Sequence, residues 1–348
     1  MNKKLSLLLT GILCAGLLTG CGKTLNSGFA GTYWLQTPTT VQVPETFYEK
    51  IEYKVTTEAE YEGSKLTNLN EGDLYFNLDS NKSSYVTELK SENGVYVYTT
   101  TLTMSGEYIF AGEGYVVEND VTTTKTTFKG YEDDFACIKS EKTIKSTLPT
   151  VSTPTSKDQF VTINATITTE YGEKNAMHTL TADETSKAYF SSLSEPVTIK
   201  KYNKNAYIEN DLMLLLARNF SYEDTLSYSF STIESATGEL SKLKIAPDSR
   251  STSTSSESAS QSTAFKTLTI QNCQIDNVIR TINFNTFRLK FSTTGEYAQD
   301  FTYAYYANSL DSEAKDPNNL SRHYMVKCYK PALYNTQYMV FTIERITH

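Results

Sequence analysis

Histidine is scarce in this chain: among 348 residues there are only His178, His323 and His348. Histidine often transfers protons near neutral pH, and it is the commonest metal ligand. The three histidines form no cluster with metal-ligand spacing, so we expect each to be a surface residue. The chain also lacks the G-x-S-x-G, S-x-x-K, H-E-x-x-H, phosphate-loop and dinucleotide-binding patterns. We therefore predict a protein that is not an enzyme and that uses neither a cofactor nor a metal.

One short run of carboxylates, Glu132, Asp133 and Asp134 in "YEDDF" (131–135), has the residue types of a calcium site or a glycosidase. Adjacent residues of a strand point to opposite faces, and no D-x-D-x-D-G loop is present. Acidic side chains are mostly exposed in proteins, so we interpret this run as a solvated turn.

Basic residues are outnumbered, with 32 Lys and Arg against 40 Asp and Glu and a formal net charge of −8. No stripe of basic residues is present along the chain. Nucleic-acid binding depends on clustered Lys and Arg, and so does electrostatic docking to anionic lipid headgroups. We therefore expect no nucleic-acid partner and no membrane contact of that electrostatic kind.

Long apolar runs are absent after residue 21, where the longest stretch without a polar side chain has six residues, 212–217. A membrane-spanning helix needs about 20 apolar residues. The start of the chain differs, because Lys3 and Lys4 precede an apolar run over 5–18, which is the layout of a secretory signal. The run ends in "LTGC" (18–21), which matches the bacterial lipobox.

The lipobox predicts that the Cys21 thiol accepts a diacylglyceryl group and becomes the first residue of the mature protein. Acyl chains such as palmitate anchor a protein because each buried CH₂ contributes roughly 0.8 kcal/mol. We predict a signal peptide over 1–20, a lipidated tether over 21–31 and a domain over 32–348. The membrane is then the partner, and the domain lies on the outer face of a bacterial cell membrane. A plain signal peptide with an incidental cysteine is the alternative.

Five cysteines are present, of which Cys14 belongs to the predicted signal and Cys21 to the anchor. An odd number remains, Cys137, Cys273 and Cys328, so at most one disulfide can form within the chain. An extracytoplasmic location permits a disulfide. If a disulfide forms, we expect it to join Cys273 and Cys328, since both lie on predicted C-terminal strands; three buried thiols that pack as small apolar groups are the alternative.

Apolar and polar residues alternate over most of the chain, as in "IEYKVTTEAEY" (51–61), which is typical of a strand with one solvated face. Asn-Gly, Ser-Gly and Gly-x-Gly breaks supply the positive φ of tight hairpins. No helical pattern separates the early strands, which predicts an antiparallel meander. The expected fold is all-β, a curved sheet or half-barrel. The further predicted strands are 72–78, 83–90, 94–104, 107–112, 114–119, 135–144, 160–172, 178–184, 188–193, 197–208, 225–234, 240–247, 265–274, 283–292, 301–308, 323–331 and 337–346.

Two polar segments interrupt this pattern. A Thr-, Ser- and Pro-rich stretch over 145–159 leaves open whether the domain has one lobe or two. A Ser- and Thr-rich stretch over 248–264 is too polar to be buried, and we expect a disordered surface loop.

Aromatic residues are abundant, with 25 Tyr and 16 Phe against one Trp. Aromatic and β-branched side chains suit a pleated, half-buried surface. A sugar-binding platform usually shows a few exposed aromatics, whereas here they are spread along every strand. We therefore favour sheet packing as their main role.

The stretch "ENDLMLLLARNF" (209–220) is the one convincing helix, with Asn210 or Asp211 available as its cap. A helix that is apolar nearly all round must be covered nearly all round. Arg218 lies near its C-terminal end, where a cation complements the helix dipole. One apolar stripe holds Leu212, Leu215, Leu216 and Phe220, and the other faces hold Met213, Leu214 and Ala217.

A lipoprotein signal, an antiparallel meander and a late apolar helix together resemble the LolA-like lipoprotein-carrier superfamily. That resemblance implies a curved half-barrel that cups an apolar cavity under a helical lid. The segments 33–56 and 207–220 are also similar to uncharacterised surface lipoproteins of Gram-positive gut bacteria, which implies a host with a single membrane. The matching lid positions are Asn210, Leu214, Leu215 and Arg218.

Two functions follow from the two roles that the helix can have. We favour the lid, in which case the protein is a non-enzymatic module that binds or carries an apolar ligand such as a lipid; the second role gives the alternative. If it is only core, the protein is a structural or adhesive surface lipoprotein. The deciding quantity is the space between helix and sheet, since a cavity of about 300 Å³ or more suits a small ligand, whereas close packing indicates core. The candidate ligand or lid residues are Leu212, Met213, Leu215, Leu216, Phe220 and Arg218.

Overall fold

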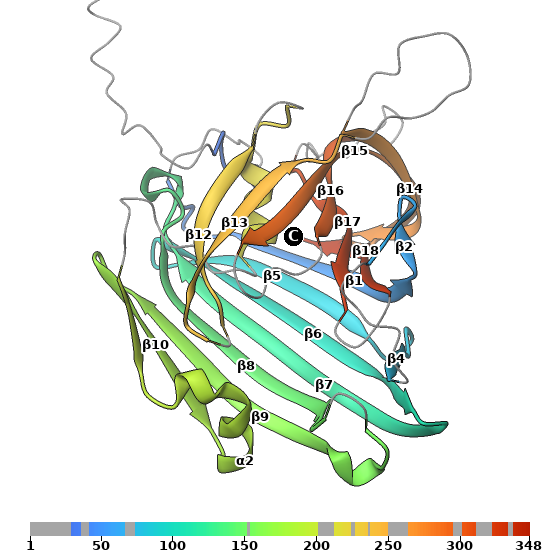
Figure 1. Ribbon diagram of the computed structural model, residues 1–348. Coiled ribbons are helices and arrows are strands. Elements are labelled where there is room, and N and C mark those ends of the chain that lie inside the picture. Colours follow the sequence, from blue (N-terminus) through green and yellow to red (C-terminus); the bar gives the residue numbers. More distant parts are fainter. Residues whose placement is uncertain are drawn as a thin grey trace, which may run out of the picture.

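The computed structural model describes residues 29–35, 42–66, 74–151, 154–200, 212–223, 227–235, 237–249, 264–294, 301–310, 322–332 and 337–348. Strands dominate, and the predicted all-β class is confirmed (Figure 1). No helix in this part of the chain is long and apolar enough to cross a membrane. The predicted signal, Cys21, the cap residues Asn210 and Asp211 and the interior of the Ser- and Thr-rich loop (250–263) lie outside the described residues.

The first half of the sheet is a meander of long antiparallel strands. Asn93 and Gly94 both have positive φ in the hairpin between β5 (Ser84–Glu92) and β6 (Val95–Phe110), as the Asn-Gly pair predicts. The strands are β1 (Tyr48–Glu58), β4 (Tyr75–Leu78), β5 (Ser84–Glu92), β6 (Val95–Phe110), β7 (Glu113–Phe128), β8 (Cys137–Pro149), β9 (Phe160–Tyr171), β10 (Asn175–Ala182) and β11 (Val197–Lys200). A small hairpin of β2 (Glu60–Tyr61) and β3 (Ser64–Lys65) stands apart.

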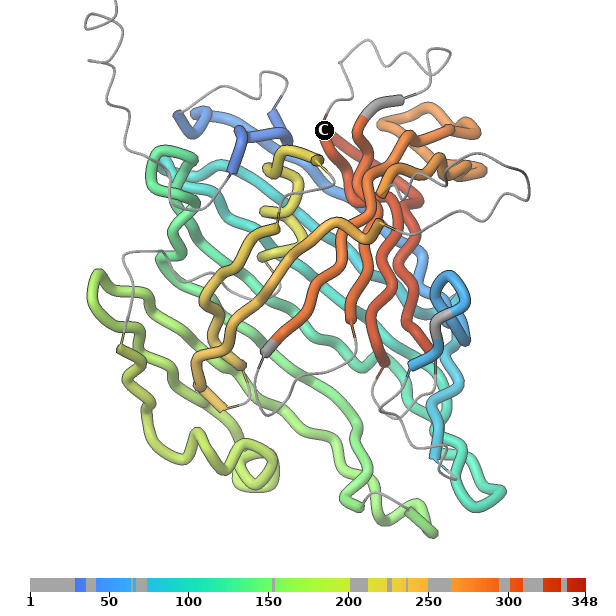
Figure 2. Tube along the Cα trace, turned by 45° about the horizontal axis from the view of Figure 1, so that its top comes forward, coloured from blue at the N-terminus to red at the C-terminus, as the bar shows by residue number. Residues whose placement is uncertain are grey.

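The second half supplies β12 (Tyr228–Ile233), β13 (Leu240–Pro247), β14 (Phe265–Ile275), β15 (Val278–Thr294), β16 (Thr302–Leu310), β17 (Met325–Pro331) and β18 (Tyr338–Thr347). Because β18 pairs with β1, both halves belong to one sixteen-stranded sheet. Its order is β11-β10-β9-β8-β7-β6-β5-β1-β18-β17-β16-β15-β13-β12, with β4 on β6 and β14 on β15 and β18. The sheet curls so that β12 and β13 lie opposite the long strands (Figures 1 and 2).

The two ends of the curled sheet meet through side chains, because no ladder joins β11 to β12 in the described chain. Ala176 of β10, Ile199 of β11 and Ile233 of β12 form one buried apolar cluster. His178 Nε2–H donates to the carbonyl oxygen of Ser235 at 3.1 Å. The result is a barrel-like body closed along one side by a short seam of packed residues.

Three predictions about elements are wrong. The ranges 94–104 and 107–112 form the single strand β6, whose pairing with β7 shifts between Met104 and Gly106. The range 188–193 is helical, in η3 (Ala188–Leu193) after α2 (Glu184–Lys187), because Asp183 caps α2 by accepting from Ser186 N. The range 51–61 is not one strand, since β1 ends at Glu58 and Glu60–Tyr61 forms β2, which pairs with β3.

The polar range 145–159 contains the end of β8, which runs to Pro149, and η2 (Lys157–Gln159). The strands on either side, β8 and β9, are paired neighbours in the same sheet.

The carboxylate run lies in η1 (Tyr131–Asp133), a 3-10 turn without a buried residue. No group of three or more His, Cys, Asp or Glu side chains in the described part of the chain is arranged to hold a metal.

The folded domain already includes residue 29, so its predicted start at residue 32 is wrong. Phe29 is 5% exposed and Trp34 is fully buried. Phe29 forms an isolated β-bridge with Phe220, and Ala30 N donates to the Asn219 carbonyl oxygen at 2.6 Å. The segment 29–35 is therefore part of the core.

The predicted disulfide is not formed, because Cys273 and Cys328 are both free, buried thiols, like Cys137. Cys328 pairs with Phe341 of β18, whereas the residue after Cys273 pairs with Arg345 of the same strand. Three or four residues of strand correspond to roughly 10–13 Å, and a disulfide needs Cα atoms within about 7 Å. Burial raises the pKa of both thiols, to about 11 for Cys273 and about 12 for Cys328.

Candidate functional site

The predicted helix lies inside the curled sheet as α3 (Met213–Leu216) followed by η4 (Ala217–Asn219). Its candidate ligand residues are almost fully enclosed, and Tyr306 Oη donates to the Leu214 carbonyl oxygen at 2.9 Å. The helix is therefore covered on nearly all faces. The exposed fractions are 0% for Leu212, 1% for Met213, 3% for Leu215, 0% for Leu216, 0% for Phe220 and 2% for Arg218.

The space between this helix and the sheet is very small. A gap of about 10 Å³ lies beside Leu214 and Leu215, between the helix and β1, β5, β6 and β17. That volume is no larger than one water molecule requires, whereas small-ligand sites have roughly 300–1,000 Å³. In this structure the helix packs as core.

Arg218 forms a buried ion pair with Glu49 of β1, and this partner was not predicted. Nη1 lies 2.5 Å from Oε1 and Nη2 lies 3.1 Å from Oε2, with both residues 2% exposed. The guanidinium also donates through Nε and Nη2 to the Arg322 carbonyl oxygen, and it lies over the Tyr324 ring. Burial opposes the charge, but the Glu49 carboxylate outweighs it and raises the pKa of Arg218.

The expectation that the histidines lie at the surface is wrong for two of them. His178 is 1% exposed at the seam, where Nδ1 accepts from the Thr169 hydroxyl at 2.8 Å, and burial lowers its pKa. His323 is 6% exposed, and its Nδ1–H donates to the Arg218 carbonyl oxygen at 2.7 Å. Its ring stacks between Tyr33 and Tyr222, with centroids 4.0 and 4.3 Å away.

Because of this enclosure, burial lowers the pKa of His323 to about 4. An unfolded histidine has a pKa near 6.5, so between pH 6.5 and 4 the unfolded chain binds a proton that the folded chain excludes. We expect His323 to remove about 3 kcal/mol of stability as the pH falls through that window, and nothing above it. Urea unfolding of the wild type and of His323→Asn from pH 7.5 to 4 measures this, since Asn tolerates the local φ of 47°. An unchanged pH slope in H323N would contradict the assignment.

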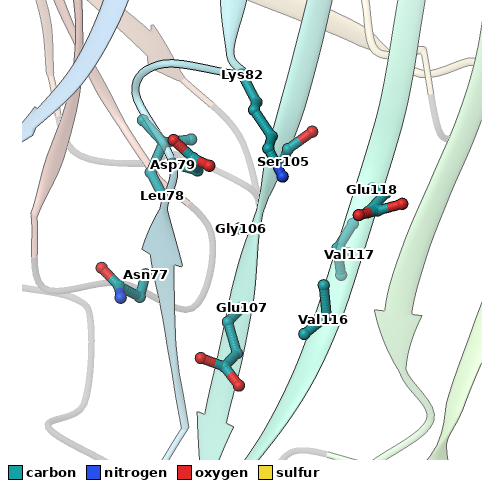
Figure 3. Close-up of a pocket in the computed structure, with 10 residues that line it drawn as sticks. All are labelled: Asn77, Leu78, Asp79, Lys82, Ser105, Gly106, Glu107, Val116, Val117 and Glu118. Atoms are coloured by element: carbon teal, nitrogen blue, oxygen red, sulfur yellow. The ribbon is translucent and has the colours of Figure 1, made fainter.

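An open cavity of about 350 Å³ lies on a different part of the molecule, along β4, β6 and β7. Figure 3 shows its polar side chains on neighbouring strands and on the loop that follows β4. Even-numbered residues of β6 such as Tyr98 point to the core, so Glu107 points to the outer face of the sheet. We call this cavity the β4 groove; its polar lining is Asn77, Asp79, Lys82, Ser105, Glu107 and Glu118.

Sequence reasoning missed both Glu49 and the β4 groove. Glu49 lies 169 residues from Arg218, and no local pattern links the two. The strands of the groove were predicted, but the pairing of β4 with the distant end of β6 was not.

No family model, curated protein or solved structure matches this chain.

Proposed function

We propose that this protein is a non-enzymatic, lipid-anchored surface protein of a bacterial cell, which meets other molecules through the outer face of its barrel-like domain. The observation that carries the proposal is the close packing around α3, with a gap of about 10 Å³. A carrier of an apolar ligand would need that helix to leave its place, together with the buried ion pair of Arg218 and Glu49. The core role of the helix therefore supports the structural or adhesive alternative over the carrier.

The position of the N-terminal segment supports a fixed orientation of the domain, with the β4 groove on the side away from the membrane. Seven residues, 22–28, separate the proposed anchor at Cys21 from Phe29, so the two are at most about 29 Å apart. Trp34 contacts Tyr96 at the start of β6, whereas Ser105 and Glu107 of the β4 groove lie nine to eleven residues further along that strand. That is roughly 30–36 Å. Strand β4, which lines the groove, and the 29–35 segment lie toward opposite ends of the long strands (Figures 1 and 2).

The anchor is tested by metabolic labelling of cells with a palmitate analogue. We expect the wild type to be labelled and to fractionate with the membrane, and Cys21→Ser to lose both properties. Cys14→Ser is the matched control within the same leader and keeps them. Equal labelling of the wild type and C21S would contradict the anchor.

The choice between core helix and lid is tested by native mass spectrometry of the detergent-extracted protein. We expect the mass of the acylated chain alone, because the structure leaves no room for a lipid beside α3. A further adduct of several hundred daltons that disappears on denaturation would instead establish the carrier function.

A further inference from the structure

An exposed aromatic ring, that of Tyr75, lies beside the β4 groove, two residues along β4 from Asn77 and outside the residues that line the cavity. By register, Tyr75 lies opposite Ile109, and Asn77 lies opposite Glu107. On the other side of β6, Glu107 lies opposite Val116. Residues two apart on a strand share a face, so Tyr75 and Val116 lie on the same outer face as the carboxylate of Glu107. Tyr75 is 48% exposed and Val116 is 63% exposed.

Tyr75 is one of a few exposed aromatic residues in the described part of the chain, with Tyr48, Tyr189, Phe265 and Phe301, and it is the one that lies beside the groove. Most tyrosines there pack in the core or under the β2–β3 hairpin, where Tyr61 stacks on Tyr303 at 3.9 Å. A tyrosine on a sheet would ordinarily be half-buried against its neighbours. Tyr75 instead presents a flat, amphipathic surface beside a polar cavity, which is the arrangement that a sugar-binding platform requires.

The polar groups of the groove are acceptors and donors spaced over three strands. Asp79, Glu107 and Glu118 offer carboxylate oxygens, although Asp79 Oδ1 already accepts from Asn81 N at 3.0 Å. Lys82 and Asn77 add an ammonium and an amide, both exposed. A carboxylate accepts hydrogen bonds from hydroxyl groups, and such charge-assisted bonds are about twice as strong as neutral ones.

We propose that the β4 groove binds a neutral saccharide. Sugar hydroxyls donate to the carboxylates and accept from Lys82, while the C–H face of the sugar ring lies on Tyr75. Three carboxylates against one ammonium disfavour an acidic polymer, and the volume of about 350 Å³ is at the lower end for small-ligand sites. This inference rests on the proposed function, because it names the ligand class for the outer face that points away from the membrane.

The test applies the full-length, detergent-extracted protein to an array of neutral and acidic oligosaccharides, followed by titration calorimetry with the best ligand. We expect a neutral oligosaccharide to bind. Tyr75→Ala and Glu107→Gln should each weaken binding at least tenfold. Tyr48→Ala is the matched control, since Tyr48 is 41% exposed on another strand and should leave the affinity unchanged. Circular dichroism verifies that all variants are folded.

Three outcomes would overturn the inference: no glycan is retained, an acidic oligosaccharide binds more tightly than any neutral one, or Y75A and E107Q bind as the wild type does. The anchor is measured independently. An acylated protein that binds no glycan therefore refutes the groove alone, whereas a glycan-binding protein that is not acylated refutes the anchor alone.

Discussion

Glu49→Gln is expected to lower the free energy of unfolding by about 3–5 kcal/mol, because it leaves the Arg218 guanidinium buried without its counter-charge. Both side chains are 2% exposed, and the guanidinium makes two contacts to the carboxylate. Small domains are stable by only about 5–15 kcal/mol, so this is a large loss. Urea unfolding followed by the fluorescence of Trp34, the single tryptophan of the chain, measures it.

Two controls separate the buried charge from the loss of a side chain. The double variant Glu49→Leu with Arg218→Met removes both charges, and we expect it to regain much of the stability, since apolar replacements of buried pairs are often neutral or better. Glu52→Gln breaks a pair with Arg345 in which the side chains are 27% and 46% exposed, and it should cost at most about 1 kcal/mol. If E49Q and E52Q cost the same, the pair is not buried in solution.

The strands could be predicted because their causes are local. Alternation over Ile51, Tyr53 and Val55 indicates one buried face, and Asn93–Gly94 indicates a hairpin. The helix at 188–193 was missed because "AYFSSL" is short and contains the β-formers Tyr189 and Phe190. The Asp183 cap of α2 is a local signal that could have been read from the sequence, whereas the burial of Phe190 and Leu193 depends on tertiary contacts. Short segments follow their environment more than their propensity.

The apolar helix also shows this difference between local features, which can be read from the sequence, and long-range contacts, which cannot. Because its side chains are apolar on nearly all faces, the helix must be buried, and in the structure it is. What covers it depends on pairings far apart in sequence, such as β1 with β18. Arg218 near the helix end suggested only a dipole interaction, whereas its strongest partner lies on β1. The burial of His323 between Tyr33 and Tyr222 likewise joins three segments that no periodicity connects.

Trp34→Ala should cost about 3–5 kcal/mol, the range for removing a large aromatic residue from a core. Trp34 is fully buried and contacts Tyr96, Phe128 and Phe135, with ring centroids 5.2–6.3 Å apart. Thermal unfolding followed by circular dichroism measures the effect without needing tryptophan fluorescence. Trp34→Phe is the matched control, and it should lose much less because it keeps an aromatic ring in place.

The same substitution tests how the domain is held. The segment 29–35 joins the core through Trp34, through the Phe29–Phe220 bridge and through Tyr33 N, which donates to Asn219 Oδ1 at 2.9 Å. Loss of Trp34 should therefore make this segment a target for a protease in membrane-bound W34A, releasing the domain from its proposed anchor, whereas W34F remains attached. If W34A is as stable and as protease-resistant as the wild type, residues 29–35 belong to the tether, and the β4 groove has no fixed orientation relative to the membrane.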